Sequence, residues 1–432
     1  MAESTTTVPR RAVAGWVLYD LANTIFSMGV VSLVFPLWVR GQVGEARADA
    51  AYGVITGISM GVIFLVSPLL GAWTDRARRR MPFLVISTVL CVIATALLAR
   101  AGFTLTAGLF VLANICYQAG LQFYDSLLPE VSNESNRGKI GGIGVGVGYI
   151  GSYVAVGASL YLGTENLPRL FTLYALAFAL LAVPCFLFVR ERGNPRPRPL
   201  TFKGAIESVR ETLATLRTTQ KYPGLARFLI GRIFYTDAIN TVISFMTLFT
   251  VNVALAHGHD RAAAGQQAQF IMLAAISCAI VGGFFWGRMT DRLGPKRALT
   301  LVLYCWMGFF SLAGATGLFA LPLGAMYVVA CGAGFSLGGI WAADRPYMLR
   351  LTPPGRVGEF YGLYGMVGRF SAITGPFLWA AILHVTVDGL GLAPLQGQGI
   401  AVLSLLGMTI VSFTILRHVT DTPRDWEKLA RE

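Results

Sequence analysis

Charged residues are scarce in this sequence of 432 residues. They make up 13% of the chain, and 55% of the residues are hydrophobic, whereas soluble domains contain about 25% charged residues. This deficit excludes an ordinary soluble globular protein. A secretory signal is also lacking, because the polar opening MAESTTTVPRR is not followed by a short apolar region and a cleavage site. We therefore expect an integral membrane protein whose first span acts as its own insertion signal.

Residues that build reactive or metal sites are few as well. The sequence has four histidines, no CxxC pair and six cysteines, all of which fall in apolar runs. His257 and His259 form a lone HxH without a third ligand, which is weak evidence for a metal. A membrane-embedded enzyme would need a nucleophile and a base, or a metal cluster, within its spans. We expect no enzyme, no metal and no cofactor, and we interpret the cysteines as small buried apolar residues.

Long apolar runs are what the sequence has in abundance. A spanning helix needs about 20 mainly apolar residues, and continuous runs favour helices over a β-barrel. We predict an all-α membrane protein with twelve transmembrane helices in two six-helix bundles. The predicted spans are residues 15–39, 52–72, 82–99, 103–123, 139–162, 169–189, 225–256, 266–287, 298–319, 320–343, 360–384 and 394–417.

The basic residues are distributed unevenly between the two sides of such a bundle. With both termini on one side, the termini and loops of that side carry 28 of the 35 Lys and Arg residues. With residues near the end of a span counted with the adjoining loop, the opposite loops carry five, and two fall deep within spans. The positive-inside rule then places both termini in the cytoplasm. The net charge of +13 is thus a signal of orientation, and we expect no nucleic-acid partner.

A long cytoplasmic stretch separates the sixth span from the seventh. We predict an N-terminal bundle at residues 1–189, a linker at 190–224 and a C-terminal bundle at 225–432. The linker opens with the stiff, proline-rich RERGNPRPRPL. Apolar residues at helical spacing then predict an amphipathic helix on the inner leaflet, with a disordered linker as the alternative. These apolar residues are Ile206, Val209, Leu213 and Leu216.

The two halves of the chain repeat one another. DLANTIFS at 20–27 recurs as DAINTVIS at 237–244, and GAWTDRARRR recurs as GRMTDRLGPKR after the eighth span. The offsets stay between 216 and 219 residues. An even number of spans in each half makes this a parallel repeat. The matched residues are Asp20, Asn23, Thr24 and Ser27 with Asp237, Asn240, Thr241 and Ser244; Gly71, Asp75 and Arg76 with Gly287, Asp291 and Arg292; and Asp125 and Arg137 with Asp344 and Arg356.

These motifs carry a resemblance to a known family. The pattern G-x-x-x-D-R-x-x-R-R and its copy resemble the signature of the major facilitator superfamily. YDLANTIFS, FYDSLLPEVSNESNRGKIGGIGVGVGYIG and RPYMLRLTPPGRVGEFYGLYG resemble its vacuole-effluxer-like, autophagy-related group. The resemblance implies the major facilitator fold and, as in eukaryotic members, amino-acid export. Asp344 stands where that group would have a small polar residue, and cation-coupled sugar symporters share part of the pattern.

Asp75 and Asp291 end their spans at the inner surface. Each carboxylate can pair with the following arginine and face the N-terminus of a neighbouring helix. The resemblance implies a seam that joins the halves in the outward-open state and parts when the transporter turns inward. The alternative is that these loops only fix topology through their charge. The expected latch residues are Gly71, Asp75, Arg76, Arg79, Asp125 and Arg137, with Gly287, Asp291, Arg292, Arg297, Asp344 and Arg356 in the second half.

Polar residues within the spans predict a pathway for a solute or ion. The set that begins at Asp20 lies at i, i+3, i+4 and i+7, which is one face of a helix, and exposing that face to lipid would be costly. The resemblance implies that spans one and seven line the central cavity. The expected pathway residues are Asp20, Asn23, Thr24, Ser27, Asn114, Gln118, Gln122, Asp237, Asn240, Thr241, Ser244 and Arg369.

Other features within the spans are open to more than one interpretation. The amides of span four can serve ordinary hydrogen bonding between helices instead. Arg369 lies deep enough to meet an anionic group or Asp237, whereas Arg232 can snorkel to the inner surface. The GxGxxG match in span five lacks the preceding strand of a nucleotide site. Its small residues instead predict close helix packing.

The function expected from these features is secondary active transport of a small polar or zwitterionic solute, with an amino acid favoured, by alternating access. A carboxylate in a low-dielectric cavity can take up a proton near neutral pH, so H⁺ is the suspected coupling ion and Na⁺ the second candidate. Alternatives are a cation-coupled sugar symporter, a lipid flippase and a non-transporting sensor. We expect a monomer in the cell (inner) membrane, if bacterial, with the solute and the bilayer as partners.

Overall fold

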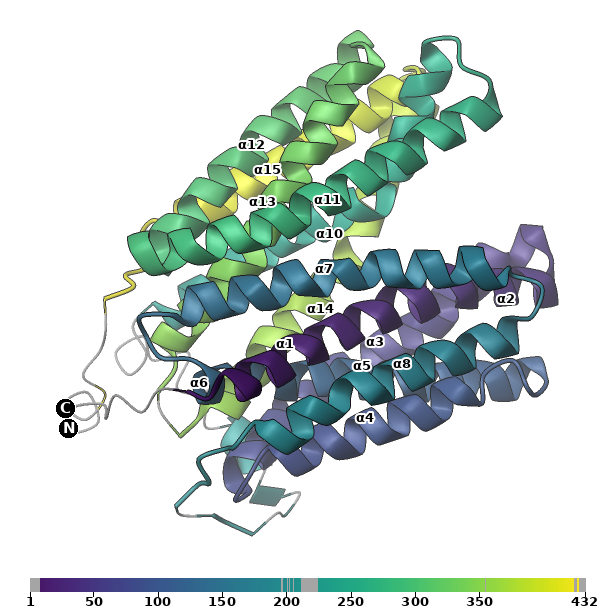
Figure 1. Cartoon of the computed structure of the whole chain (residues 1–432). Coiled ribbons are helices and arrows are strands. Elements are labelled where there is room, and N and C mark those ends of the chain that lie inside the picture. The colour runs from purple at the N-terminus through teal and green to yellow at the C-terminus, as the bar shows by residue number, and fades with distance from the viewer. Residues whose placement is uncertain are drawn as a thin grey trace. The chain divides into compact units, whose positions relative to one another are not determined.

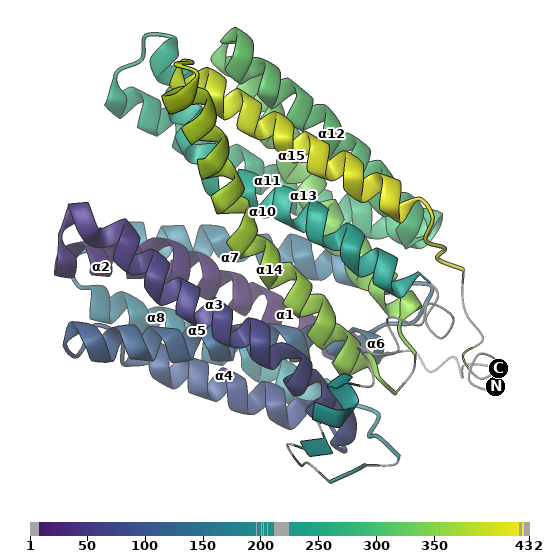
Figure 2. The ribbon, with the colours of Figure 1, turned by 180° about the vertical axis from the view of Figure 1, so that it is seen from behind.

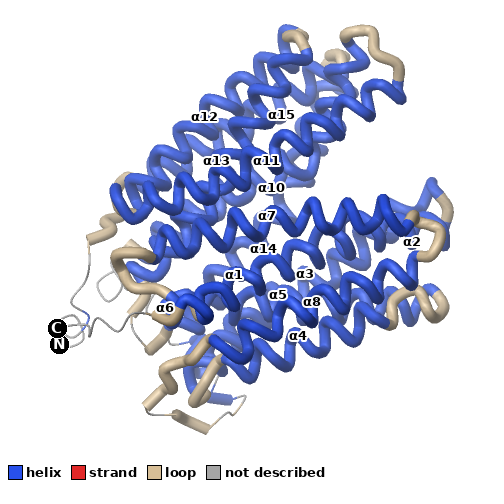
Figure 3. The backbone as a smooth tube through the Cα atoms, in the orientation of Figure 1, coloured by secondary structure: helices blue, strands red, loops and turns tan. Residues whose placement is uncertain are grey.

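A computed structural model describes residues 8–210 apart from 196, 200, 202 and 205, residues 224–422 apart from 354, and Trp426. All regular structure in this part of the chain is helical, without a β-strand (Figures 1 and 3). Eleven helical segments among these residues are long and apolar enough to cross a membrane, and α4 (Met81–Ala96) is a shorter apolar helix. The predicted all-α membrane fold is confirmed.

Each predicted span corresponds to a helix or helical segment whose ends differ from the predicted ones by up to eight residues. α11 (Arg261–Leu293), for example, extends beyond the predicted 266–287 at both ends, because polar and basic residues continue the helix past its apolar centre. α4 is instead shorter than the predicted 82–99. The reason lies in the turn that follows α4, where Ala99 takes a positive φ of 59°.

The helices form two compact units. The first unit lies within Met1–Thr212 and Pro353–Met366, and the second within Leu213–Thr352 and Val367–Glu432 (Figure 2). The first contains α1 (Arg10–Ile25), η1 (Phe26–Val34), α2 (Phe35–Val43), α3 (Glu45–Arg76), α4, α5 (Phe103–Ser126), α6 (Leu128–Val131), α7 (Arg137–Leu162) and α8 (Leu167–Phe188). The second contains α10 (Leu225–Ala256), α11, α12 (Pro295–Phe319), α13 (Leu323–Leu351), η2 (His384–Gly389) and α15 (Pro394–Leu416).

Glycines of α7 allow close packing in the first unit, as the small residues of span five predict. α1 packs against α7 and α8. A Cβ added at Gly151 would lie 2.7 Å from the Leu21 carbonyl oxygen, and one at Gly148 would touch Asp20 and Thr24. Only residues without a side chain let two helix backbones approach this far. The packing interpretation of span five is therefore confirmed.

Glycines also join α11 and α13 in the second unit. A Cβ at Gly338 would lie 2.6 Å from the Ala279 carbonyl oxygen and closer still to the Gly283 nitrogen. Gly334 meets the Ala275 carbonyl in the same way, one turn earlier on α13. Gly334 and Gly338 form a GxxxG spacing that our sequence analysis did not use.

We expect Gly338→Val to lower the free energy of unfolding by about 3 kcal/mol, at the upper end of typical overpacking costs. The neighbouring atoms are backbone atoms, which cannot rotate away. Thermal unfolding of the purified protein in detergent measures the change. Gly308→Val is the matched control, because Gly308 of α12 is exposed and has nothing within 4 Å of its Cβ position. Equal melting temperatures for the two variants would contradict the packing argument.

α14 (Val357–Leu383) contributes residues to both units. Residues up to Met366 belong to the first unit, where the backbones of Gly71 and Gly358 meet and Gly362 packs on Ser67. Residues from Val367 belong to the second unit. The predicted C-terminal bundle, 225–432, included the whole helix. The start of α14 packs closely against α3 because glycines on both helices leave no side chain between the two backbones.

The predicted linker is only partly described. Residues 206–210 are helical, and Ile206 is 44% exposed. Leu213 and Leu216, which complete the predicted amphipathic pattern, lie outside the described residues.

Candidate functional site

The Asp20 carboxylate is buried between α1 and α7. Asp20 is 7% exposed, and a Cβ at Gly148 would lie 3.4 Å from its Cγ. Thr24 donates a hydrogen bond to the Asp20 carbonyl oxygen at 3.1 Å. Asn23 is 3% exposed, and neither its amide nitrogen nor its oxygen has a hydrogen-bond partner in the described part of the chain. The first half of the chain thus holds a carboxylate and an unsatisfied amide in adjacent turns.

α1 changes its helical form next to these residues. The α-helix ends at Ile25 and continues as the π-helix η1. Ser27 lies in this segment, donates to the Thr24 carbonyl at 3.2 Å and shares a hydrogen bond with Tyr117 of α5. π-Helical segments occur frequently at functional sites. No sequence signal that we used predicts this segment.

Asp237 is the counterpart of Asp20 and has direct partners on α14. The Thr374 hydroxyl donates to its Oδ2 at 2.7 Å, and the Thr241 hydroxyl approaches Oδ1 at 3.4 Å. The backbone N–H of Gly375 also bonds this carboxylate. Asp237 is 4% exposed. The second unit therefore surrounds one buried carboxylate with hydroxyl and amide donors from two helices.

The remaining residues of the second stripe differ in exposure. Thr241 is buried and Asn240 is half-buried, whereas Ser244 is exposed and donates to the Asn240 carbonyl at 2.9 Å. The stripe is therefore most enclosed at its Asp237 end.

The amides of α5 bond to the neighbouring helix α3. Asn114 donates to the Ser59 hydroxyl at 2.7 Å, and Gln122 donates to the Ser67 carbonyl at 3.0 Å. Both side chains are buried, whereas Gln118 is half-buried. These contacts agree with the alternative interpretation of the stripe as interhelical hydrogen bonding. The acceptor oxygens Asn114 Oδ1 and Gln122 Oε1 have no partner among the described residues.

Arg232 does not reach a surface. It is 3% exposed and donates from Nε to Asp344 Oδ2 at 3.0 Å, while Tyr235 donates to Asp344 Oδ1 at 2.6 Å. The snorkelling interpretation of Arg232 is therefore wrong, because a fully buried carboxylate on α13 holds its guanidinium. Asp344 serves this ion pair in the core of the second unit. Arg369 of α14 is also buried, at 6% exposure.

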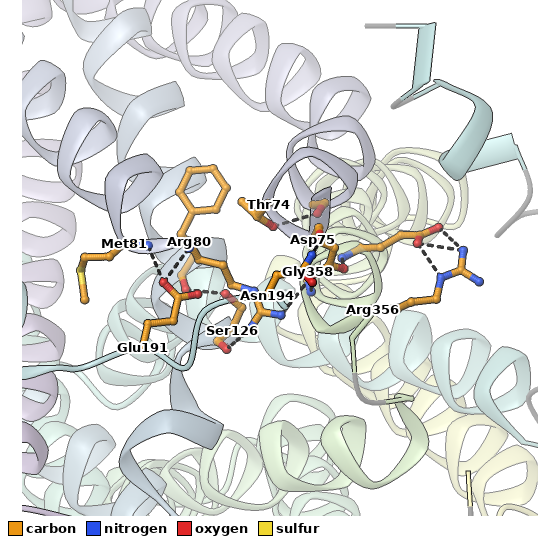
Figure 4. A network of polar contacts seen from close by, with 12 residues as sticks. Thr74, Asp75, Arg80, Met81, Ser126, Glu191, Asn194, Arg356 and Gly358 are labelled. Atoms are coloured by element: carbon orange, nitrogen blue, oxygen red, sulfur yellow. Dashed lines mark hydrogen bonds and ion pairs between the residues drawn. The ribbon is translucent and has the colours of Figure 1, made fainter. Parts of the chain in front are cut away.

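Asp75 of α3 faces the N-terminus of a neighbouring helix, α14, as its position at the end of a span predicts. Its two carboxylate oxygens accept the backbone N–H groups of Gly358 at 2.8 Å and Glu359 at 2.7 Å (Figure 4). Free N–H groups at a helix N-terminus favour a negative charge. Asp75 and the start of α14 both belong to the first unit.

The ion-pair partner of Asp75 differs from the expectation. Asp75 pairs with Arg80, five residues away, at 3.0 Å. Arg76, the predicted partner, turns toward residues after α8 and donates to the Ser208 hydroxyl at 3.0 and 3.2 Å. Arg356, the residue before α14, pairs with Glu359 in the first turn of that helix at 2.8 Å. The α3–α4 loop bends back on itself, which brings Arg80 rather than Arg76 beside the carboxylate.

The other expected latch residues show fewer contacts with neighbouring helices than Asp75 does. Gly287 is buried near the end of α11, Asp291 is half-buried, and the following turn uses Gly294 at a φ of 86°. Asp125 is buried at the end of α5, and Arg137 begins α7. Arg79, Arg292 and Arg297 are exposed and form no ion pair among the described residues. The contacts of Asp75 with α14 are the most developed part of the predicted latch.

Two carboxylates that our sequence analysis missed cap helices in equivalent places. Glu191, just after α8, accepts the backbone N–H groups of Arg80 at 2.6 Å and Met81 at 3.0 Å, at the start of α4 (Figure 4). Asp421, just after α15, accepts the N–H of Lys296 at 3.1 Å, at the start of α12. Both follow the last helix of their half. An acidic residue shortly after a predicted final span is the signal that could have found them.

A third carboxylate, Glu130 of α6, also bonds the stretch of chain that follows α8. It accepts the backbone N–H of Arg192 at 3.1 Å. Burial raises the pKa of Glu130 above its ordinary value, and the Arg192 N–H and the positive charge of Arg80 oppose the rise. The residues that follow α8 are therefore fastened at several points to the loops of the first unit.

Comparison with known proteins identifies relatives over nearly the whole chain. Residues 38–419 match the family described as "Vacuole effluxer Atg22 like". The chain is 25% identical over 434 residues to the uncharacterized MFS-type transporter YxiO of Bacillus subtilis, covering 96% of this chain and 97% of that protein. It is 23% identical to autophagy-related protein 22 of Eremothecium gossypii, covering 82% and 75% of the two chains.

Solved structures share the fold at low sequence identity. The human organic anion transporter MFSD10 matches with a TM-score of 0.68 and 17% identity, covering 96% of this chain and all of that one. The proton:xylose symporter XylE matches with a TM-score of 0.67 and 14% identity, covering 98% and 97%. At these identities the likeness concerns the fold.

Proposed function

Since the chain belongs to the Atg22-like vacuole effluxer family of MFS-type transporters, we propose that it moves a small polar or zwitterionic solute by alternating access. An amino acid is the favoured solute, on family membership. The transport is coupled to a cation, with H⁺ as the first candidate and Na⁺ as the second. Fold alone does not select a substrate, so the residues of the site have to support the choice of solute.

The observation that carries this proposal is the pair of buried carboxylates at repeated positions. Asp20 and Asp237 are 7% and 4% exposed in membrane-spanning helices. Ionisable residues within membranes are costly and mark ion or substrate pathways. A zwitterionic solute fits these residues, because its amino group can pair with a buried carboxylate and its own carboxylate with Arg369, which is also buried. Hydroxyl and amide groups on the same helix faces suit sugar hydroxyls too, which makes sugar symport the second candidate.

The proposed location follows from the distribution of basic residues. The side that carries 28 of the 35 Lys and Arg residues is the cytoplasmic side by the positive-inside rule. We therefore propose that both termini are cytoplasmic and that the protein acts as a monomer.

A thermal-shift screen of the purified full-length protein tests the solute class. The panel contains amino acids, peptides, sugars and nucleosides. A solute that binds only the folded state stabilises it by about 2.7 kcal/mol at 100 times its Kd, so amino acids are expected to raise the melting temperature. Each positive solute is then tested for uptake into proteoliposomes. A shift with sugars alone would favour the second candidate, and no shift and no uptake with the panel would contradict the proposal.

A further inference from the structure

A polar cavity of about 350 Å³ lies within the first unit. It forms where the end of α3, the residues after α8 and the first turn of α14 meet. Asp75 on one wall bonds the start of α14, whereas no role has been assigned to the cavity itself. The cavity is lined by Ala72, Asp75, Arg76, Asn194, Arg198, Ser208, Gly355, Arg356 and Glu359.

Positive charge exceeds negative charge around this cavity. Asp75 is neutralised by Arg80 at 3.0 Å, and Glu359 by Arg356 at 2.8 Å. Arg76 and Arg198 form no ion pair with a carboxylate in the part of the chain that the structure describes. Two guanidinium groups, each carrying one positive charge at all relevant pH values, therefore remain uncompensated in one cavity.

The walls that carry these two arginines are held in place. The backbone N–H of Arg198 donates to the Arg76 carbonyl at 2.9 Å. The Arg76 guanidinium is oriented by Ser208, at 3.0 and 3.2 Å, and Asn194 donates to the Asp75 carbonyl at 2.8 Å. These bonds fasten the chain after α8 to the end of α3. A ligand would meet a pre-oriented Arg76 guanidinium and a fixed backbone at Arg198, which lowers the entropic cost of binding.

We propose that this cavity binds a phosphate group, either free, on a small phosphorylated metabolite or on a lipid headgroup. A phosphate monoester carries about −1.5 to −2 charges at pH 7, which matches the two arginines that have no carboxylate partner among the described residues. The planar guanidinium also bonds phosphate oxygens in a bidentate manner. Bound phosphate would lie beside the hydrogen bonds between Asp75 and the start of α14. It would therefore stabilise the contact between α3 and α14. The inference does not depend on the transported solute.

Binding to the full-length protein in phosphatidylcholine nanodiscs tests the proposal. The probe is inorganic phosphate, titrated at constant ionic strength with chloride as the reference anion, and the readout is the melting temperature. Wild-type protein is expected to show a saturable rise. Arg198→Gln is expected to weaken apparent phosphate affinity at least tenfold, about 1.4 kcal/mol. Because only the backbone of Arg198 bonds in the described structure, this variant should fold normally without phosphate.

Arg190→Gln is the matched control. It removes the same charge from the same stretch of chain, at an exposed residue outside the cavity, and its response to phosphate should equal that of wild type. A second arm replaces a tenth of the lipid with phosphatidic acid. If the headgroup is the ligand, this lipid raises the melting temperature of wild type but not of Arg198→Gln, and soluble phosphate adds nothing.

Two results would overturn the proposal. One is a wild-type melting temperature that neither phosphate nor phosphatidic acid changes. The other is an equal response of Arg198→Gln and Arg190→Gln, which would mean a non-specific effect of charge. Neither readout involves transport, so failure here leaves the proposed transport function untouched.

Discussion

Asp237→Asn is expected to uncouple solute uptake from the ion gradient in proteoliposomes. The substitution keeps the size of the side chain and an oxygen that can accept from Thr374, which bonds the carboxylate at 2.7 Å. It removes the negative charge to which a proton or a sodium ion would bind. Accumulation driven by a pH gradient, or by Na⁺ compared with choline, should fall to the level seen without a gradient.

Asp388→Asn is the control for the loss of an acidic residue from the second unit. Its side chain is 67% exposed and lies beside His384 in η2, away from the buried stripe, so gradient-driven uptake should persist. Asp20→Asn extends the test to the first copy of the motif. Full gradient dependence in both Asp20→Asn and Asp237→Asn would rule out the proposed coupling role of the pair.

The second large effect concerns stability. We expect Asp344→Ala to lower the free energy of unfolding by about 3–5 kcal/mol, the usual cost of removing one partner from a buried ion pair. Asp344 is fully buried, and Arg232, which is 3% exposed, would keep its charge without this carboxylate. Equilibrium unfolding in detergent at several denaturant concentrations measures the change.

The double variant Arg232→Met with Asp344→Leu separates the cost of an unpaired charge from the value of the pair itself. Replacing both partners by apolar residues of similar volume is often close to neutral, so most of the lost stability should return. If the double variant is as unstable as Asp344→Ala, a different contact of Asp344 determines the stability of this region.

The elements that could be predicted from the sequence are those set by the bilayer and by the repeat. An apolar run of about 20 residues has to be helical in lipid, because its backbone groups must bond within the segment. The sequence therefore predicts the ends of the spans to within eight residues. The repeat likewise led to Asp237 and Asp75 as buried or capping carboxylates, before any partner was known.

The partners of these carboxylates could not be predicted in the same way. Arg76 follows Asp75 directly, yet Arg80 forms the ion pair because the loop turns back. Arg232 and Asp344 are 112 residues apart in sequence, and only the packing of α10 against α13 brings them together. Side-chain partners depend on the course of the loops and on the rotation of each helix about its axis. The spacing of residues along one helix gives no information on either.

The two carboxylates that cap α4 and α12 relate the beginning of the central linker to the segment that follows α15. Glu191 follows the last helix of the first half and Asp421 follows the last helix of the second, and each bonds the start of the third span of its own half. One of these segments leads into the second half and the other follows the last span of that half, yet both bond the start of a helix through a carboxylate. A repeated unit of six spans thus includes not only its helices but also the segment that follows the sixth span. The beginning of the central linker is therefore part of the first copy of the repeat.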